Sequence, residues 1–398
     1  MPSWRDSIDA LATGGAVARE RLLLGVESLL DGATAANDFP ATSADISVAW
    51  LDRVLRDRFP DARVESMTRL DETAGTSDRA RLRLTYGEDA ESATPAPPET
   101  VFVKLAPASV RTRLFSNLMQ LGVNEVRFYR EIAADVPIAV PDVYHADIGR
   151  VADRYVLVLE DLAARGARFS DVSTKITADV ARRVVGELAR LHAKFWRSVA
   201  LADRLSWLRS PTHCPRLRQE RFLCAAAIAP GLERFADAVP AEVRASSRRL
   251  VAARDALDLY SAGLAPTLLH GDCHLGNLFF DGDTVGFLDW QVVQCGPGMR
   301  DVTYFLINST PTEVRRDNES DLLHHYLDTL GAEGIEAPAF EDAWLQYRLF
   351  AVHPWIASIV TAAAATLQSD AIARAGVART CRALLELDTL SALDEIGG

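Results

Sequence analysis

Apolar positions follow two different periods along this chain. In the first part they form short runs typical of β-strands, and after about residue 160 they recur at the three- and four-residue spacing of amphipathic helices. The pattern predicts strands at residues 62–70, 79–86, 101–105, 140–146 and 155–160. A β-rich part should therefore precede a mostly helical one, which favours the α+β class.

Helical spacing predicts where the larger elements lie. Leu114, Leu118, Leu121, Val126 and Tyr129 indicate a helix within residues 109–134, between the third and fourth strands. Later helices are expected at residues 177–196, 241–260, 319–330, 340–367 and 371–390, and a helical N-terminal extension at about residues 22–58.

Charge and composition exclude some classes of partner. The chain has 398 residues and a net charge of −12, which argues against nucleic acid as the main partner because backbone phosphates demand a basic surface. The most apolar stretch, residues 355–367, is too short to span a bilayer, so no membrane partner is expected. No signal peptide is apparent, and five cysteines without a CxxC pair fit reduced thiols in the cytoplasm.

The most informative segment is HGDCHLGN at residues 270–277, followed by Asp289 within GFLDW. His270 stands two residues before Asp272, and Asn277 five after it, which is the spacing of the kinase catalytic loop H-R-D-x-x-x-x-N. Phosphoryl transfer requires a carboxylate at the attacking hydroxyl and oxygen ligands for Mg²⁺. Asp272 is the candidate for the first role, and Asn277 with Asp289 for the second.

A hairpin should bring the two metal ligands together. Residues 278–280 and 285–288 are β-rich, and Asp281-Gly282-Asp283 between them is a turn signal. Asn277 would then lie at the entrance of the hairpin and Asp289 at its exit, so that one Mg²⁺ could contact both.

These motifs resemble the aminoglycoside phosphotransferase and choline kinase family. The resemblance lies in HGDxHxxN followed by LDWQ, and the RDVTYFL that follows is most similar to ecdysteroid-kinase-like and related bacterial small-molecule kinases. Gly271 replaces the Arg of protein kinases. The resemblance implies a bilobal protein-kinase-like fold with a small antiparallel sheet, one key helix and a larger helical lobe. We expect an N-terminal extension at 1–60, a nucleotide-binding N-lobe at 61–162, and a C-lobe with the catalytic loop and acceptor site at 163–398.

The N-lobe of such a kinase holds the nucleotide through a strand Lys and a helix Glu. Lys104 fits the first role. The resemblance places the Glu ahead of an aromatic pair, which selects Glu125, with Glu131 as the alternative.

Weaker signals indicate further nucleotide contacts. Residues 71–78 between the first two strands have one glycine, and Gly75, Thr76 and Ser77 could present amides and hydroxyls to phosphate, although a plain hairpin turn is nearly as well supported. By resemblance, the adenine-binding hinge is Glu160, Asp161 and Leu162, acting through its backbone.

Two more residues are assigned structural roles by the resemblance. His270 would hold the catalytic loop, and Asp301 would brace that loop from within the lobe.

The sequence thus predicts a Mg²⁺- and ATP-dependent kinase that phosphorylates a hydroxyl of a small molecule. The net acidity is compatible with a cationic acceptor such as an amino sugar. The alternatives are a kinase-like nucleotide-binding or scaffold protein without turnover, and an antibiotic-inactivating aminoglycoside or macrolide kinase. The oligomeric state is left open.

Overall fold

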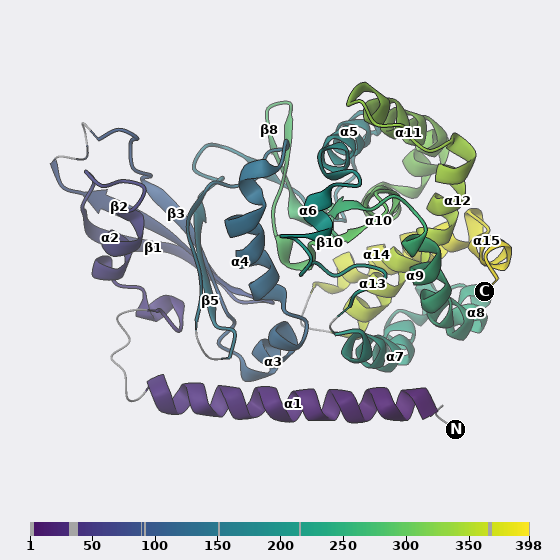
Figure 1. The fold of residues 1–398 in the computed structure, drawn as a ribbon, viewed down its shortest axis with the longest axis horizontal. Coiled ribbons are helices and arrows are strands. Elements are labelled where there is room, and N and C mark those ends of the chain that lie inside the picture. The colour runs from purple at the N-terminus through teal and green to yellow at the C-terminus, as the bar shows by residue number, and fades with distance from the viewer. Residues whose placement is uncertain are drawn as a thin grey trace. The chain divides into compact units, whose positions relative to one another are not determined.

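The computed structural model describes residues 4–31, 39–88, 90, 93–149, 152–214, 216–364 and 368–397. The chain forms two compact units (Figure 1). The N-terminal unit contains Met1–Asp135 and Val140–Ala167, and the C-terminal unit contains Val136–Ala139 and Arg168–Gly398. The division predicted at residues 60 and 162 is not tested by these units and stays a prediction.

The N-terminal unit is built on a five-stranded antiparallel sheet. Its strands are β1 (Val64–Thr73), β2 (Asp78–Tyr86), β3 (Thr100–Leu105), β4 (Val143–Ile148) and β5 (Tyr155–Glu160), in the order β1-β2-β3-β5-β4. Alternate side chains are buried in the middle of β2, at Ala80, Leu82 and Leu84, and all of β5 is buried except Glu160. The predicted α+β class with a small antiparallel sheet is confirmed.

One predicted helix of this unit is two helices. Residues 109–134 form α3 (Val110–Leu118) and α4 (Leu121–Glu131), separated where Gln120 takes a left-handed backbone conformation with φ of 57°. The start of α4 lies close to β5, because a Cβ on Gly122 would come within 2.0 Å of the Tyr155 ring. The glycine therefore lets α4 pack against the sheet, which positions the acidic residues of that helix.

Two further helices belong to the N-terminal unit. Helix α1 (Trp4–Asp31) begins well before the predicted residue 22, and α2 (Val48–Leu55) packs on β1. Glu27 on α1 is buried and pairs with Arg113 at 2.8 Å and Arg154 at 3.0 Å. Charged contacts of Glu27 therefore fix this helix to the rest of the N-terminal unit.

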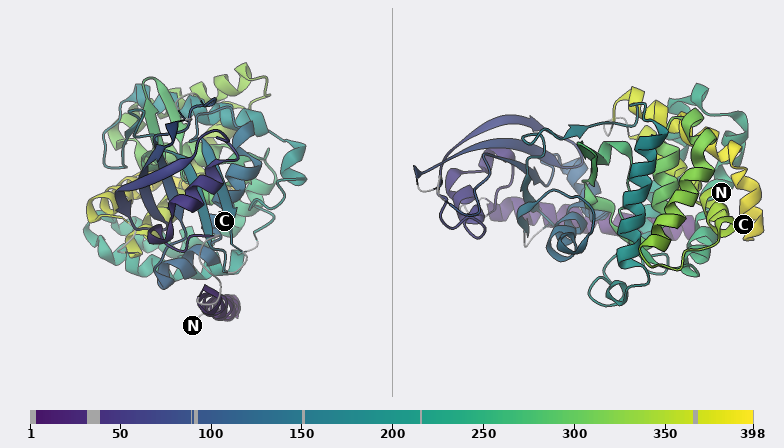
Figure 2. Two further views of the ribbon diagram at one scale, coloured as in Figure 1. Left: turned by 90° about the vertical axis from the view of Figure 1, so that its left-hand side faces the viewer. Right: turned by 90° about the horizontal axis from the view of Figure 1, so that it is seen from above.

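The C-terminal unit is mostly helical, as predicted. Its longer helices are α5 (Ala178–Phe195), α7 (Leu217–Arg234), α8 (Ala241–Ala252), α9 (Arg254–Ala262), α10 (Met299–Ser309), α11 (Thr312–Ala332), α12 (Phe340–Phe350), α13 (Val352–Ala363) and α14 (Asp370–Glu386). Two short ones are α6 (Val199–Ala202) and α15 (Thr389–Glu395). Helices α5 and α11 pack against each other (Figure 2), and ten of the eleven residues of α10 are buried. The centre of this unit is therefore α10, which follows directly on the catalytic motifs.

Short strands carry those motifs. Strand β7 (Thr267–Leu269) pairs with β10 (Gln294–Gly296), and β8 (Leu278–Asp281) pairs with β9 (Thr284–Phe287) and with β6 (Arg168–Phe169). The hairpin predicted between Asn277 and Asp289 is present, with Gly282 at a positive φ of 57° in its turn. None of the described helices combines the length and apolarity needed to cross a membrane.

Candidate active site

A buried ion pair forms the centre of the predicted nucleotide site in the N-terminal unit. Lys104 lies on β3 between β2 and β5, and its Nζ is 2.6 Å from Oε2 and 2.8 Å from Oε1 of Glu125 on α4. The two side chains are 4% and 1% exposed. The alternative, Glu131, is instead 32% exposed and pairs with Arg127 on its own helix. The structure therefore places Glu125, and not Glu131, against Lys104.

The predicted phosphate loop is shorter than expected. Strand β1 continues to Thr73, and β2 begins at Asp78, so only four residues connect them. Gly75 is exposed, Thr76 half-buried and Ser77 buried, and the Ser77 hydroxyl accepts a hydrogen bond from Arg79 Nε at 3.2 Å. The geometry is that of a tight hairpin turn, and a phosphate role for these residues stays a prediction.

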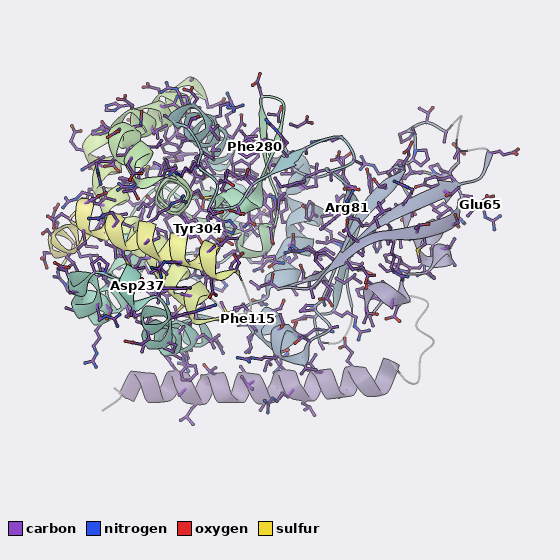
Figure 3. The ribbon with its side chains drawn as sticks, turned by 180° about the vertical axis from the view of Figure 1, so that it is seen from behind. Glu65, Arg81, Phe115, Asp237, Phe280 and Tyr304 are labelled. Atoms are coloured by element: carbon purple, nitrogen blue, oxygen red, sulfur yellow. The ribbon has the colours of Figure 1, made fainter. Side chains whose placement is uncertain are left out.

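The predicted hinge is held by its side chains as well as its backbone. Both oxygens of the buried Asp161 accept hydrogen bonds from Arg81 on β2, at 3.0–3.2 Å (Arg81 is labelled in Figure 3). Glu160 accepts from Arg165 at 2.7 Å, and the carbonyl of Leu162 accepts from the Ala167 N–H at 3.1 Å. Sequence reasoning missed Arg81, since it stands 80 residues before Asp161 in no recognised motif.

In the C-terminal unit, Asp301 fixes the start of the catalytic loop. Its two carboxylate oxygens accept hydrogen bonds from the backbone N–H groups of His270 at 2.7 Å and Gly271 at 3.0 Å, and His192 Nε2 lies 3.5 Å away. Burial alone would raise the pKa of Asp301, but His192, His270 and the Gly271 N–H outweigh it and hold this pKa below its ordinary value. Asp301 therefore stays ionised as a brace for the loop.

Gly271 explains why this loop departs from the protein-kinase pattern. Its φ is +84°, and a Cβ there would lie 2.2 Å from the Val292 carbonyl oxygen and 2.5 Å from Gln294 Nε2. Any larger residue would collide with backbone, so the Arg of the protein-kinase motif has no room at this position.

His270 links the loop to the strand that precedes Asp289. Its Nε2 is 3.1 Å from the Leu288 carbonyl oxygen, and its Nδ1 accepts a hydrogen bond from the Asp272 N–H at 3.3 Å. Burial lowers the pKa of His270 although the nearby carboxylates raise it, so the ring is neutral, and these partners assign the proton to Nε2. These are the contacts of a residue that holds the loop backbone.

Both oxygens of the Asp272 carboxylate are engaged. Oδ1 accepts a hydrogen bond from the Tyr304 hydroxyl at 2.6 Å, and Oδ2 lies 3.3 Å from Asn277 Nδ2 and 3.7 Å from His274 Nε2. Burial, followed by the Asp272 charge, raises the pKa of Tyr304 well above its ordinary value, so Tyr304 (labelled in Figure 3) remains a donor. The Asp272 side chain is still 32% exposed and can be reached by a substrate.

Asn277 and Asp289 are brought together through the backbone. The Asn277 carbonyl oxygen accepts a hydrogen bond from the Leu288 N–H at 3.0 Å, extending the β8–β9 ladder by one pair. Asp289, the next residue, has a left-handed backbone with φ of 65°, which ends that ladder. The hairpin therefore brings Asn277 and Asp289 close together along the backbone, as the turn signal at residues 281–283 predicted.

A surface hollow elsewhere in the C-terminal unit does not include these residues. It has a volume of about 660 Å³ and is lined by residues such as Asp237, Glu313, Arg316 and Arg379 (Asp237 is labelled in Figure 3). None of its lining residues belongs to the catalytic loop, so we assign it no catalytic role.

Comparison with known proteins decides the family. The model of the phosphotransferase enzyme family matches residues 94–334, which is more than half of the chain. This chain belongs to that family. The match spans Lys104, Glu125 and the whole catalytic loop, and it confirms the predicted membership and assigns the protein to the kinase-type phosphotransferases. The narrower likeness to ecdysteroid-kinase-like proteins stays a prediction.

Solved structures give more distant similarities. A putative aminoglycoside phosphotransferase from Ralstonia eutropha JMP134 is 14% identical, with a TM-score of 0.49 over 85% of this chain and 96% of that one. A choline kinase from Cryptosporidium parvum Iowa II is 10% identical, with a TM-score of 0.48 over 88% and 98%. The amicoumacin kinase hAmiN, solved with AMP-PNP, Ca²⁺ and Ami, is 14% identical, with a TM-score of 0.46 over 80% and 88%. A search of curated proteins finds no match.

Proposed function

We propose that this family member transfers the γ-phosphate of ATP, with Mg²⁺, to a hydroxyl group of a small molecule. The observation that carries the proposal is the arrangement at Asp272, whose carboxylate is oriented by Tyr304 and Asn277 in a loop braced by Asp301. Small-molecule kinases need a carboxylate fixed in this way, since the reaction depends on positioning and on charge stabilisation more than on covalent chemistry.

Asp272 is the group that would receive or orient the acceptor hydroxyl. With Oδ1 occupied by Tyr304 and the carboxylate partly exposed, Oδ2 is the oxygen better placed to take the hydroxyl proton, and Asn277 is a weaker competitor for it at 3.3 Å. Tyr304 is then a positioning residue that fixes the rotation of the carboxylate.

The metal ligands in this proposal are Asn277 and Asp289, and their donors fit Mg²⁺. Asn277 Nδ2 donates to the Asp272 carbonyl oxygen at 2.9 Å, which leaves the side-chain oxygen as the ligand atom. Within the described part of the chain no three His, Cys, Asp or Glu side chains gather as metal ligands, so a bound ion would keep water or phosphate oxygens as its other ligands, as Mg²⁺ usually does. When bound, Mg²⁺ would neutralise charge on the transferred phosphate.

Lys104 would hold the phosphates of the nucleotide. Glu125 holds its ammonium group at one position, and both side chains of the pair are buried. The structure of hAmiN with AMP-PNP and Ca²⁺ is consistent with nucleotide and divalent-metal use by proteins of this type. A hydroxylated small molecule as acceptor, no nucleic-acid or membrane partner and a cytoplasmic location belong to the same proposal and rest on the sequence.

The test is a screen for acceptor-dependent ADP formation with Mg·ATP, using hydroxylated metabolites and aminoglycoside and macrolide antibiotics. The wild-type protein should release ADP with one class of acceptor, and Asp272→Asn should lower kcat by several orders of magnitude while it still binds the nucleotide. Near-normal turnover by Asp272→Asn would contradict the role of this residue. ADP formation that never depends on an acceptor would contradict the proposed transfer.

A further inference from the structure

Three arginines gather near the catalytic loop in the C-terminal unit. Arg209 and Arg254 both reach the same oxygen of Glu220, at 2.9 Å and 3.2 Å, and Arg300 on α10 is the third. We call these three residues the arginine cluster. Besides Glu220, the carboxylates of Asp258 and Asp301 act on the cluster. Three cations therefore gather at one place in a chain that carries a net charge of −12.

Arg300 lacks a counter-ion in contact with it. Its guanidinium makes no hydrogen bond and no ion pair within the described residues, while it lies beside Gly296 of β10, with Nη1 3.7 Å from the position of a Cβ on that glycine. Burial, and next the charge of Arg209, lowers the pKa of Arg300 to about 10, so it remains charged at neutral pH. A guanidinium that is partly removed from water and has no contacting counter-ion lowers the stability of the fold. Groups of this kind are often retained because they bind a ligand.

His353 on α13 adds a second polar group without a partner. Its Nε2 is buried and has no hydrogen-bond partner among the residues that the structure describes. Burial, followed by the charges of Arg300, Arg254 and Arg209, lowers the pKa of His353 well below its ordinary value, so the ring is neutral. A neutral imidazole can donate one hydrogen bond to an anion without adding charge.

The arginine cluster is connected to Asp272 by a short series of contacts. Arg209 Nη1 donates to Gln294 Oε1 at 3.1 Å, and the Arg209 carbonyl oxygen accepts from the Cys295 N–H at 2.7 Å. Gln294 Nε2 in turn lies 2.5 Å from the position of a Cβ on Gly271, the residue before Asp272. Water reaches the cluster, because the side chains of Arg209 and Arg254 are 24% and 13% exposed.

We propose that the arginine cluster binds an anionic group of the acceptor, a carboxylate or a phosphate, whose hydroxyl is presented to Asp272. Guanidinium groups match the geometry of both anions and can bind them through two parallel hydrogen bonds. The bound anion would supply the counter-charge that Arg300 lacks. This inference rests on the proposed function, because only a kinase has an acceptor whose hydroxyl receives the phosphate. It predicts hydroxy acids or phosphorylated alcohols as substrates, and not amino sugars.

The test measures anion binding by calorimetry at constant ionic strength, with inorganic phosphate and gluconate as probes, and sorbitol as the neutral counterpart of gluconate. At least one of the two anions should bind the wild-type protein, and Arg300→Gln should weaken that binding at least tenfold. Arg316→Gln is the control, since Arg316 is 54% exposed and pairs with Glu386. Lys104→Met should keep the binding, which separates this site from a nucleotide-phosphate site. Binding of phosphate but not gluconate would indicate a phosphorylated acceptor. Binding of gluconate would indicate an acceptor with a carboxylate.

Absence of binding by both anions, or equal binding by wild type and Arg300→Gln, would overturn the inference. A second readout is the thermal stability of Arg300→Gln without anions, which should equal or exceed that of the wild type because a half-buried charge without a contacting counter-ion is removed. A marked loss of stability would show that Arg300 serves the fold instead. Neither readout needs turnover, so a failure of the proposed kinase activity would leave both results interpretable.

Discussion

The buried Lys104–Glu125 pair predicts a strong and reciprocal effect on stability. The side chains are 4% and 1% exposed and 2.6 Å apart, so replacing one partner leaves the other charge in a desolvated site. Breaking a buried ion pair in this way costs about 3–5 kcal/mol, a large share of the roughly 5–15 kcal/mol that stabilise a typical protein. We expect this loss for Glu125→Gln and for Lys104→Met alone.

The double variant Lys104→Met/Glu125→Gln distinguishes a pair from two independent residues. With both charges removed, stability should return to within about 1–2 kcal/mol of the wild type, whereas nucleotide affinity should stay low because the ammonium group is absent. Urea unfolding followed by circular dichroism measures the first, and calorimetry with AMP-PNP the second. Glu131→Gln is the matched control on the same helix, where an exposed pair is worth about 0.3–0.5 kcal/mol. A Glu125→Gln variant as stable as Glu131→Gln, or a double variant as unstable as the sum of the singles, would refute the reasoning.

Three further predictions concern the C-terminal unit. Tyr304→Phe removes the 2.6 Å hydrogen bond to Asp272, so kcat should fall about tenfold or more with the nucleotide KM unchanged. An unchanged kcat, or a loss confined to the nucleotide KM, would contradict the positioning role. Gly271→Ala should lower stability by about 2 kcal/mol or more in urea unfolding, since its Cβ would lie 2.2 Å from the Val292 carbonyl oxygen, and an unchanged midpoint would count against this. Because the pKa of His353 is depressed in the folded state, unfolding takes up a proton below about pH 6.5. The free energy of unfolding should therefore fall below that pH, by up to about 1.4 kcal/mol per pH unit for this residue. His353→Gln should make that fall less steep in unfolding measured from pH 7 to 5, and an equally steep fall would contradict the assignment.

The catalytic loop was predictable because its information is local. His270, Asp272 and Asn277 stand at fixed spacing, and the Asp-Gly turn signals the hairpin that brings Asp289 back to Asn277. The sheet was equally predictable from short apolar runs. In both cases the local structure is determined by residues that are close together in the sequence.

Contacts between distant residues could not be predicted in the same way. Arg81 and Asp161, and likewise Tyr304 and Asp272, are joined only by the fold. Tyr304 lies within RDVTYFL, but nothing in that run indicates that its hydroxyl reaches a carboxylate 32 residues earlier.

Some elements gave a misleading or weak signal. Helix α7 was missed because it buries only Ile228, Gly231 and Leu232 and contains Pro230, so it has no continuous apolar stripe. Gly296, Pro297 and Gly298 are residues typical of turns, yet Cys295 and Gly296 lie in β10. The helical spacing of apolar residues also continues past Gln120 and Ala253, where the structure divides one expected helix into two. These divisions depend on backbone conformation and packing, which the apolar pattern does not encode.

Net charge was the least informative guide to the acceptor. The total of −12 is compatible with a cationic acceptor, whereas three arginines gather next to the catalytic loop. A sum over the chain does not describe the field at one site.

The most direct test of the central claim is a calorimetric titration with AMP-PNP in the presence and absence of Mg²⁺, because it needs no knowledge of the acceptor. The wild type and Asp272→Asn should bind AMP-PNP in a Mg²⁺-dependent manner, and Asp289→Ala should lose that dependence. Failure of the wild type to bind AMP-PNP, or a Mg²⁺ dependence that survives in Asp289→Ala, would contradict the account.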